Sequence, residues 1–337
     1  TDGSYVETTA PTSYDQVASG SWEMYGVVYN ATDGDLEISG IGTPFNIADA
    51  SYDSVSLSVS ALGIAPTSLR FNNDGTRLFV IEQNTRGVYQ YNLTTAFDIS
   101  TALYSGLSFS VASQDVYPNA IIFNADGTKM YIEGGQNNRT YQYSLSTAFS
   151  ISSASYDSIF ISHAAQASSF EAIQFNNDGS VLFAASTATD AIYEYSLPTP
   201  YNLSSASFVK SSSSLASQDA ILRDFYFNES GSKLYMLGGT GDSVFQYSLS
   251  ESFDISTISY DSISFNTTTQ DNTAYGFDFN NSGSKMYVIG IQNDTIYQYS
   301  TGSAYFTTGY QPVHTTASID TTYWTDINSM TADQNAG

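Results

Sequence analysis

Six aspartates recur along the chain at a spacing that could gather oxygen ligands. They form two series. The first contains Asp115, Asp219 and Asp271, and the second contains Asp190, Asp242 and Asp294. Consecutive members of a series are 52 or 104 residues apart. Carboxylate oxygens are the ligands that Ca²⁺ prefers, so aspartates brought together on one loop face would form a calcium site. The equivalent positions of the other copies hold Gly63, Ala167, Arg86 and Asn138. A solvated acidic rim explains the two series more simply than calcium does, and both interpretations stay open.

A second set of residues occupies one position of the same repeat and differs in every copy. The residue that precedes a recurring phenylalanine is, in order, Arg70, Ile122, Gln174, Tyr226 and Asp278. An enzyme must break the symmetry of a repeat to assemble unlike acid, base and nucleophile roles. Asp278, however, has no second carboxylate in the set, and Arg70 would as readily form a structural ion pair with it. We therefore predict that these five residues line a central channel as ligand contacts, and we predict no catalytic residue.

Three further aspartates lie in a recurring turn. Asp74, Asp126 and Asp178 each precede a glycine, and serine stands in their place in two other copies, at Ser230 and Ser282. Carboxylates arranged around a channel can hydrolyse glycosidic bonds. Aspartate in a tight turn also accepts a hydrogen bond from its own backbone, which serine does as well. The replacement by serine favours the structural role, and we predict turn residues here.

The composition excludes several classes of function. Of 337 residues, 33 are acidic and 9 are basic, and the net charge of −24 leaves the chain unable to neutralise a nucleic-acid backbone. The absence of cysteine excludes disulfides, thiolate metal sites and a cysteine nucleophile. The two histidines, His163 and His314, have no partner at a spacing typical of a zinc site. No apolar run is long enough for insertion into a membrane.

The 52-residue spacing belongs to a repeat that covers most of the chain. Five copies of one motif read FNNDGTRLFV from Phe71, FNADGTKMYI from Phe123, FNNDGSVLFA from Phe175, FNESGSKLYM from Phe227 and FNNSGSKMYV from Phe279. The period holds without insertion or deletion from Phe45 to Tyr305. A fixed period of this length is typical of propeller blades and other repeat folds.

Each repeat contains four segments with the pattern of β-strands. In the first copy they span about residues 68–72, 77–82, 87–93 and 103–110. The first two flank a turn, Asn73-Asp74-Gly75, in which glycine supplies the positive φ. The last alternates small polar with large apolar residues, which is typical of a strand with one buried face. We predict an all-β fold, a five-bladed β-propeller with four antiparallel strands in each 52-residue blade.

The ends of the repeat predict how the ring closes. Fourth strands begin at Tyr52, Tyr104, Tyr156, Phe208 and Tyr260, whereas the position 52 residues beyond Tyr260 is Pro312. The segment 51–58 is therefore spare, and the last blade lacks its outer strand. We predict that this N-terminal strand closes the last blade, because the pairing removes two exposed sheet edges. A linear solenoid is the alternative, and it would need capping repeats.

Short extensions flank the predicted propeller, which spans residues 45–305. Residues 1–44 read as an attachment segment with one hairpin around Asp33-Gly34, and residues 306–337 read as a C-terminal attachment segment. Neither extension is long enough to form an independent core. We expect both to pack on the propeller or on neighbouring molecules.

The repeat resembles a known class of propellers. The block DGTKMYI at 126–132, followed by YQYSLSTAFSIS and SYDSI, is similar to WD40-like repeats of the YVTN type, which occur in archaeal surface-layer proteins and in structural proteins of marine phages. The stretch 314–334 resembles a connecting segment of large marine phage virion proteins. The resemblance implies a propeller and an extracellular setting, and it implies no particular activity.

These observations lead to an expected function. We expect a non-enzymatic, extracellular structural or adhesion propeller of a phage virion, such as a tail fibre or decoration protein, that contacts a host surface. The alternatives are a surface-layer or appendage protein of an archaeon or bacterium, and a glycan-binding, lectin-like propeller. Expected partners are other copies, other structural proteins of the same assembly, and a cell-surface glycan or protein, without nucleic acid or membrane insertion. No cofactor is expected besides calcium at the acidic loops.

Overall fold

The computed structural model describes residues 25–29, 36–40 and 44–301. Contacts along the chain separate residues 40–304 from a second unit made of residues 1–39 and 305–337. Strands β1 (Tyr25–Tyr29) and β2 (Leu36–Gly40) pair in a two-stranded sheet, as the predicted hairpin requires. The turn Asp33-Gly34 and the predicted C-terminal segment with His314 lie outside the described residues.

Residues 44–301 form five four-stranded antiparallel sheets, which are the blades of a propeller. Blade 1 contains β4 (Pro66–Phe71), β5 (Arg77–Glu82), β6 (Gly87–Leu93) and β7 (Ala102–Ser110). Blade 2 contains β8 (Pro118–Phe123), β9 (Lys129–Gly134), β10 (Arg139–Leu145) and β11 (Ala154–Ser162). Blade 3 contains β12 (Phe170–Phe175), β13 (Val181–Ser186), β14 (Ala191–Ser196) and β15 (Ser207–Ser211). Blade 4 contains β16 (Leu222–Phe227), β17 (Lys233–Gly238), β18 (Ser243–Leu249) and β19 (Ile258–Asn266).

The last blade joins the two ends of the repeat, as the sequence predicts. It contains β20 (Ala274–Phe279), β21 (Lys285–Gly290), β22 (Thr295–Ser300) and, from the N-terminal side, β3 (Ser51–Ser58). The pairing of β3 with β22 places Tyr52 opposite Tyr299 and Leu57 opposite Ile296. The predicted five-bladed propeller with an N-terminal closing strand is therefore confirmed.

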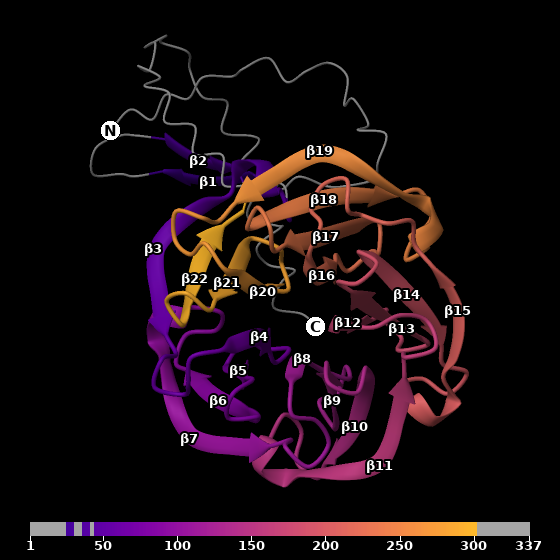
Figure 1. Ribbon diagram of the computed structural model, residues 1–337. Helices are drawn as coiled ribbons and strands as arrows, with labels where there is room; N and C mark the ends of the chain where they lie inside the picture. The colour runs from indigo at the N-terminus through magenta and orange to yellow at the C-terminus, as the bar shows by residue number, and fades with distance from the viewer. Residues whose placement is uncertain (1–24, 30–35, 41–43, 302–337) are drawn as a thin grey trace, which may run out of the picture. The chain divides into compact units, whose positions relative to one another are not determined.

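The inner strands surround a common axis. Strands β4, β8, β12, β16 and β20 each lie against the inner strands of both neighbouring blades, and the fourth strands lie on the outside (Figure 1). One short 3-10 turn lies just before the fourth strand of each blade: η1 (Ile47–Asp49), η2 (Ile99–Thr101), η3 (Ile151–Ser153), η4 (Leu203–Ser205) and η5 (Ile255–Thr257). Within the described residues no helix is both long and apolar enough to cross a membrane.

One glycine of the repeat explains why an aromatic residue recurs every 52 residues at Phe45, Phe97, Phe149, Tyr201 and Phe253. Gly75 has a φ of +70°, and a Cβ there would lie 2.3 Å from the ring of Phe97. Gly283 stands in the same relation to Phe45, and the Phe45 amide donates to the Gly283 carbonyl at 2.8 Å. The N-terminal segment therefore completes the last blade from Phe45 onward, through the same contact that the other blades make within themselves.

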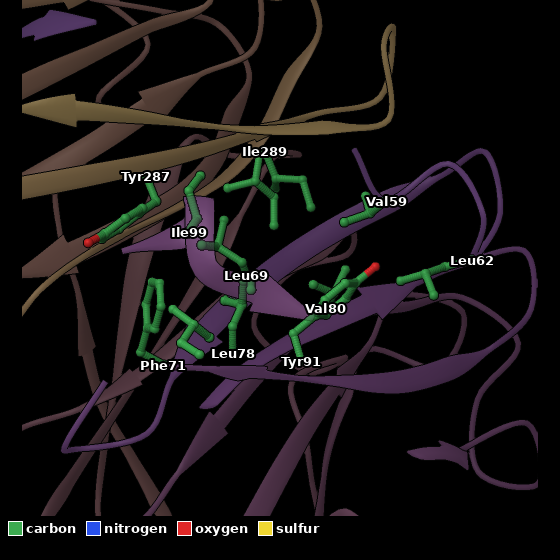
Figure 2. Packing of buried hydrophobic residues seen from close by; sticks show 13 residues of the cluster. Val59, Leu62, Leu69, Phe71, Leu78, Val80, Tyr91, Ile99, Tyr287 and Ile289 are labelled. Atoms are coloured by element: carbon green, nitrogen blue, oxygen red, sulfur yellow. The ribbon is translucent and has the colours of Figure 1, made fainter. Parts of the chain in front are cut away.

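Apolar packing between blades holds the ring together, and the junction of the last and first blades shows how. Leu69 and Val80 of blade 1 pack against Tyr287 and Ile289 of blade 5, and Val59 from the closing segment joins them (Figure 2). All five side chains are essentially inaccessible to solvent. Burial of such side chains stabilises a fold by roughly 1.5–3 kcal/mol each, so closure contributes strongly to stability.

Candidate functional site

The five unlike residues of the repeat surround one cavity on the propeller axis. Arg70, Ile122, Gln174, Tyr226 and Asp278 all line a cavity of about 280 Å³, together with residues of the turns that follow the inner strands. The predicted placement of these residues therefore agrees with the structure. Their predicted role as ligand contacts stays a prediction.

A buried ion pair dominates the electrostatics of the cavity. The Arg70 Nη1 atom lies 3.0 Å from Asp278 Oδ1, and the two side chains are only 12% and 5% exposed. Burial raises the pKa of Asp278 despite the opposing effect of Arg70. Burial would lower the pKa of Arg70, but the carboxylates of Asp278 and Asp224 outweigh it and raise that pKa. The ion pair is confirmed. Among the described residues, Arg70 is the one cationic side chain of the cavity lining, and the Asp278 carboxylate neutralises its charge.

The same polar side chains complete the hydrogen bonding of the inner strands. An inner strand has one edge without a neighbouring strand, and its amides need other acceptors. Asp278 Oδ2 accepts from the Phe71 amide of the next blade at 3.1 Å. Gln174 Oε1 likewise accepts from the Phe227 amide at 2.7 Å, and Asp224 Oδ2 accepts from the Phe277 amide at 3.0 Å. The asymmetric polar residues of the channel thus link one blade to the next.

Asp224 lies two residues before the cavity position and was not predicted from the sequence. Asp224 is 4% exposed, and its carboxylate also accepts from the Phe225 amide at 2.8 Å. Burial raises its pKa to about 6, while Arg70 and the two backbone amides act in the opposite direction. The sequence signal was a carboxylate in a strand position where the other copies have Ser68, Ala120, Ala172 and Gly276.

The raised pKa of Asp224 predicts a pH-dependent contribution to stability. The pKa of Asp224 is about 6 in the folded chain and 3.8 in the unfolded chain, so the folded chain binds the proton more tightly. Protonated Asp224 therefore stabilises the fold below pH 4, and this stabilisation is lost as the pH rises through 6. Asp224→Asn removes the titration. We expect the unfolding free energy of the variant, relative to the natural chain, to rise by about 2–3 kcal/mol between pH 3.5 and pH 7. Urea unfolding at both pH values measures this, and an unchanged difference would contradict it.

The first aspartate series caps loops inside the blades. Asp115 is 2% exposed, and its carboxylate accepts from the amides of Tyr117, Gln136 and Asn137 at 2.9–3.2 Å. The same contacts recur at Asp219 with Ile221, Thr240 and Gly241, and at Asp271 with Thr273 and Asn293. These carboxylates are buried loop acceptors, and the solvated rim is the wrong interpretation for this series because the loop amides draw the side chains inward.

In blade 1 the same carboxylate comes from a different strand. Gly63 stands in place of the aspartate, and Glu82 fills the site from the end of β5, where it accepts from the Ala65 amide at 2.8 Å and the Thr85 amide at 2.5 Å. A Cβ on Gly63 would lie 2.3 Å from the Glu82 carboxyl carbon, and a Cβ on Gly134 would lie 2.4 Å from that of Asp115. Each of these blades therefore has room for one carboxylate, which either of two positions supplies.

This exchange predicts the outcome of a two-residue swap in blade 2. Asp115→Gly alone leaves buried amides without an acceptor, so we expect a loss of about 2–3 kcal/mol of unfolding free energy. Gly134→Glu alone places two carboxylates in one site and is expected to be at least as harmful. The double variant reproduces the Gly63–Glu82 arrangement and should regain most of the loss. Additive losses, measured by urea unfolding, would contradict the exchange.

The second aspartate series links neighbouring blades. Asp190 Oδ1 accepts from the Leu222 amide at 3.1 Å, and Asp242 Oδ1 accepts from the Ala274 amide at 2.8 Å. Asn138 makes the same contact with Phe170 at 3.2 Å. Arg86 and Asp294 stand where the partner residue of the next blade is a proline, Pro118 and Pro66, which has no amide hydrogen to donate.

Among the residues that the structure describes, no three acidic or histidine side chains gather into a metal-binding group. The six aspartates lie in blades 2 to 5, with two each in blades 4 and 5, and five of them accept hydrogen bonds from backbone amides. The calcium hypothesis therefore gains no support from this geometry. The turn aspartates also serve the backbone, since Asp74 Oδ1 accepts from the Thr76 amide at 2.9 Å, and the predicted turn role is confirmed.

A second asymmetric ring lies at the start of the inner strands and was missed by the sequence analysis. Its members are Thr67, Asn119, Glu171, Arg223 and Tyr275. The Arg223 guanidinium lies over the Tyr275 ring, 4.2 Å from its centroid, and 4.0 Å from Glu171. Burial raises the pKa of Glu171 to about 7 despite the opposing effect of Arg223. The sequence did contain a signal for this ring: the repeat position three residues before the cavity residues also holds a different side chain in every copy.

His163 has a structural environment. It is fully buried, and its Nε2 atom lies 2.8 Å from Thr140 Oγ1 and 3.4 Å from a Glu133 carboxylate oxygen. Its ring packs on Phe170 and Tyr195. A histidine without solvent access cannot exchange protons with a substrate, which agrees with the prediction that it is not a catalytic base.

The aromatic side chains on the outside of the ring pack mainly on each other. In blade 1, Tyr104 of the fourth strand lies between Tyr89 and Tyr91 of the third strand, with ring centroids 6.2 and 5.6 Å away. Every blade repeats this trio, and Tyr104 is 46% exposed. The trio attaches the fourth strand to the third at a β-bulge, so its position in the repeat follows from packing.

No known sequence family and no curated protein matches the chain. Among solved structures, a functionally unknown protein from Desulfotomaculum acetoxidans has 13% identity and a TM-score of 0.43, and the match covers 71% of this chain and 86% of that one. A "putative 6-phosphogluconolactonase" from Bacteroides fragilis has the same identity and TM-score, with 73% and 65% covered. Likeness at this level carries no argument about activity. What the geometry establishes is a five-bladed β-propeller.

Proposed function

We propose that the chain is a non-enzymatic structural and adhesion propeller that acts outside the cell, as a tail fibre or decoration protein of a phage virion. The observation that carries the proposal is the structural use of the polar side chains at and beside the channel. Asp278, Gln174 and Asp224 bind backbone amides of the neighbouring blade. Their use as acceptors between blades supports a structural role for the channel residues.

Exposed apolar side chains on the loops support a contact function. Ile64 and Val116 occupy the same loop position of neighbouring blades and are 72% and 38% exposed, and Tyr117 beside Val116 is 52% exposed. The other copies of the Ile64 position have Ser168, Ala220 and Asn272. A partner protein or surface that binds the loops of blades 1 and 2 would cover these side chains. A surface-layer or appendage protein of a cell is the alternative setting for the same function.

Antibody labelling in cultures of the source organism tests the location. Label on released particles supports the virion proposal, label on the cell envelope supports the alternative, and label confined to the cytosol contradicts both.

A second experiment tests the absence of catalysis. Incubation of the natural chain with a panel of polysaccharides and nitrophenyl glycosides is expected to release no product. Turnover that disappears in a folded Asp278→Asn variant would contradict the proposal.

A further inference from the structure

We infer that the central cavity binds one neutral sugar unit, such as the terminal residue of a surface glycan. This inference rests on the proposed adhesion function and names the ligand class of the cavity. The cavity is lined by one repeat position that holds five different side chains, although the backbones of the five blades repeat. Arg70, Asp278 and the Gln174 carbonyl have structural contacts, whereas the Gln174 amide nitrogen and the Tyr226 hydroxyl have none within the described residues and can meet an asymmetric small molecule.

The charge balance of the cavity favours a neutral ligand. Arg70 is the cation of the lining, and it is already paired with Asp278 at 3.0 Å. The nearby Asp224 carboxylate adds further negative character. A carboxylate or phosphate would have to displace Asp278 from Arg70 and leave a buried charge without a partner, which is costly. A cation would meet the guanidinium of Arg70.

The free hydrogen-bonding groups suit hydroxyls. Because the Gln174 Oε1 atom is held by the Phe227 amide, the orientation of the side chain is fixed and its amide nitrogen is left as a donor in the cavity lining. No hydrogen bond joins that nitrogen or the Tyr226 hydroxyl to another residue in the described part of the chain. These two groups supply the donors, and the Tyr226 oxygen is also an acceptor.

Acceptors surround the mouth of the cavity. Asn73, Asn177 and Asn281 each donate their amide nitrogen to a backbone carbonyl of the next blade, at 2.5 Å. Their amide oxygens are thereby left as acceptors at the rim. A hydroxyl both donates and accepts, so a polyhydroxylated ring can use the donors inside and the acceptors at the mouth. Aromatic side chains in the lining, including Tyr201 and Tyr226, offer apolar surface for the C–H groups of such a ring.

The size of the cavity limits the ligand to one unit. Pockets for drug-sized molecules usually measure about 300–1,000 Å³, and this cavity of about 280 Å³ lies just below that range. A single sugar ring fits this scale, whereas a longer chain would extend out of the mouth. The expected mode is recognition of a chain end or a short branch.

Titration of the full chain with methyl glycosides of glucose, galactose, mannose and N-acetylglucosamine tests the inference, with glucuronic acid as the charged comparison. Two variants change the cavity donors. Tyr226→Phe loses only the hydroxyl, whereas Gln174→Glu keeps an acceptor for the Phe227 amide, loses the N–H donors and adds a carboxylate to the lining. The matched controls are Gln166→Glu in a loop and Tyr104→Phe on the outer strand, neither of which lines the cavity.

Calorimetry or ligand-detected NMR should show saturable binding of at least one neutral glycoside. We expect each cavity variant to weaken it about five- to tenfold, as loss of one hydrogen bond does, and we expect no effect of the controls. Absence of binding to every neutral glycoside, tighter binding of glucuronic acid, or binding by both cavity variants as tight as that of the natural chain would overturn the inference. Such a failure leaves the proposed surface location to be decided separately by the labelling experiment.

Discussion

Asp278→Ala is expected to lower the unfolding free energy by about 3–5 kcal/mol, because it leaves a buried charge without its partner. Arg70 is 12% exposed and lies 3.0 Å from Asp278. The substitution also removes the acceptor of the Phe71 and Phe279 amides, at 3.1 and 2.9 Å. Urea unfolding of the natural and variant chains at pH 7 measures the loss.

A double variant separates the cost of the unpaired charge from other effects of the substitution. Arg70→Met combined with Asp278→Leu replaces the pair by apolar side chains, a change that is often close to neutral for buried ion pairs. We expect the double variant to be more stable than Asp278→Ala, with a remaining loss from the two amides. A loss below 1 kcal/mol in Asp278→Ala would contradict the assigned role of the pair.

Removal of the closing strand is expected to have the largest effect of all. A chain that begins at residue 60 lacks β3 and Phe45, so the β22 edge is exposed and the Gly283 contact is lost. It also lacks Val59, which packs in the cluster between the last and first blades. We expect this chain to lose its cooperative thermal transition and to associate through the open edge.

Two further samples test whether the closing strand is the cause. A chain that begins at residue 44 retains the closing segment and is expected to unfold cooperatively. A synthetic peptide of residues 44–62 added to the chain that begins at residue 60 should restore part of the transition by adding a strand to the open edge. Equal thermal transitions of the two truncated chains would contradict the closure.

The architecture could be predicted because the repeat has a constant period. Five copies without insertion fix the number of blades, and the spare segment at Tyr52 fixes the closing strand. The position of the cavity residues followed from the same register, since Arg70 and Asp278 occupy one repeat position. Their direct contact, across 208 residues of sequence, was predicted from opposite charge and is confirmed at 3.0 Å.

The role of the loop aspartates could not be inferred from single positions. Their carboxylates face backbone amides, and amides leave no mark in a sequence. The signal was a correlation, because Gly63 is followed 19 residues later by Glu82, whereas Asp115 is followed at the same distance by Gly134. Prolines carry a similar signal, since Pro118 explains why Arg86 stands where other copies have an acceptor.

The most direct test of the ring is a disulfide between β3 and β22, in a chain that has no cysteine of its own. Ser58 and Thr295 are Cα partners beside the hydrogen bond from Val59 to Asp294, which makes them a non-hydrogen-bonded pair. The matched control pair is Ser243 and Asn266, which occupies the same place within blade 4. Substitution of each pair by cysteine yields two variants of similar geometry.

The two disulfides close loops of very different length, 295 − 58 = 237 residues and 266 − 243 = 23 residues. Chain entropy predicts stabilisation of about 5 kcal/mol for the first and about 3 kcal/mol for the second. The closed propeller predicts that Ser58→Cys/Thr295→Cys oxidises within one molecule and raises the unfolding free energy above that of the control. Failure to form this disulfide, or its formation only between molecules, while the control pair oxidises, would contradict the closed ring.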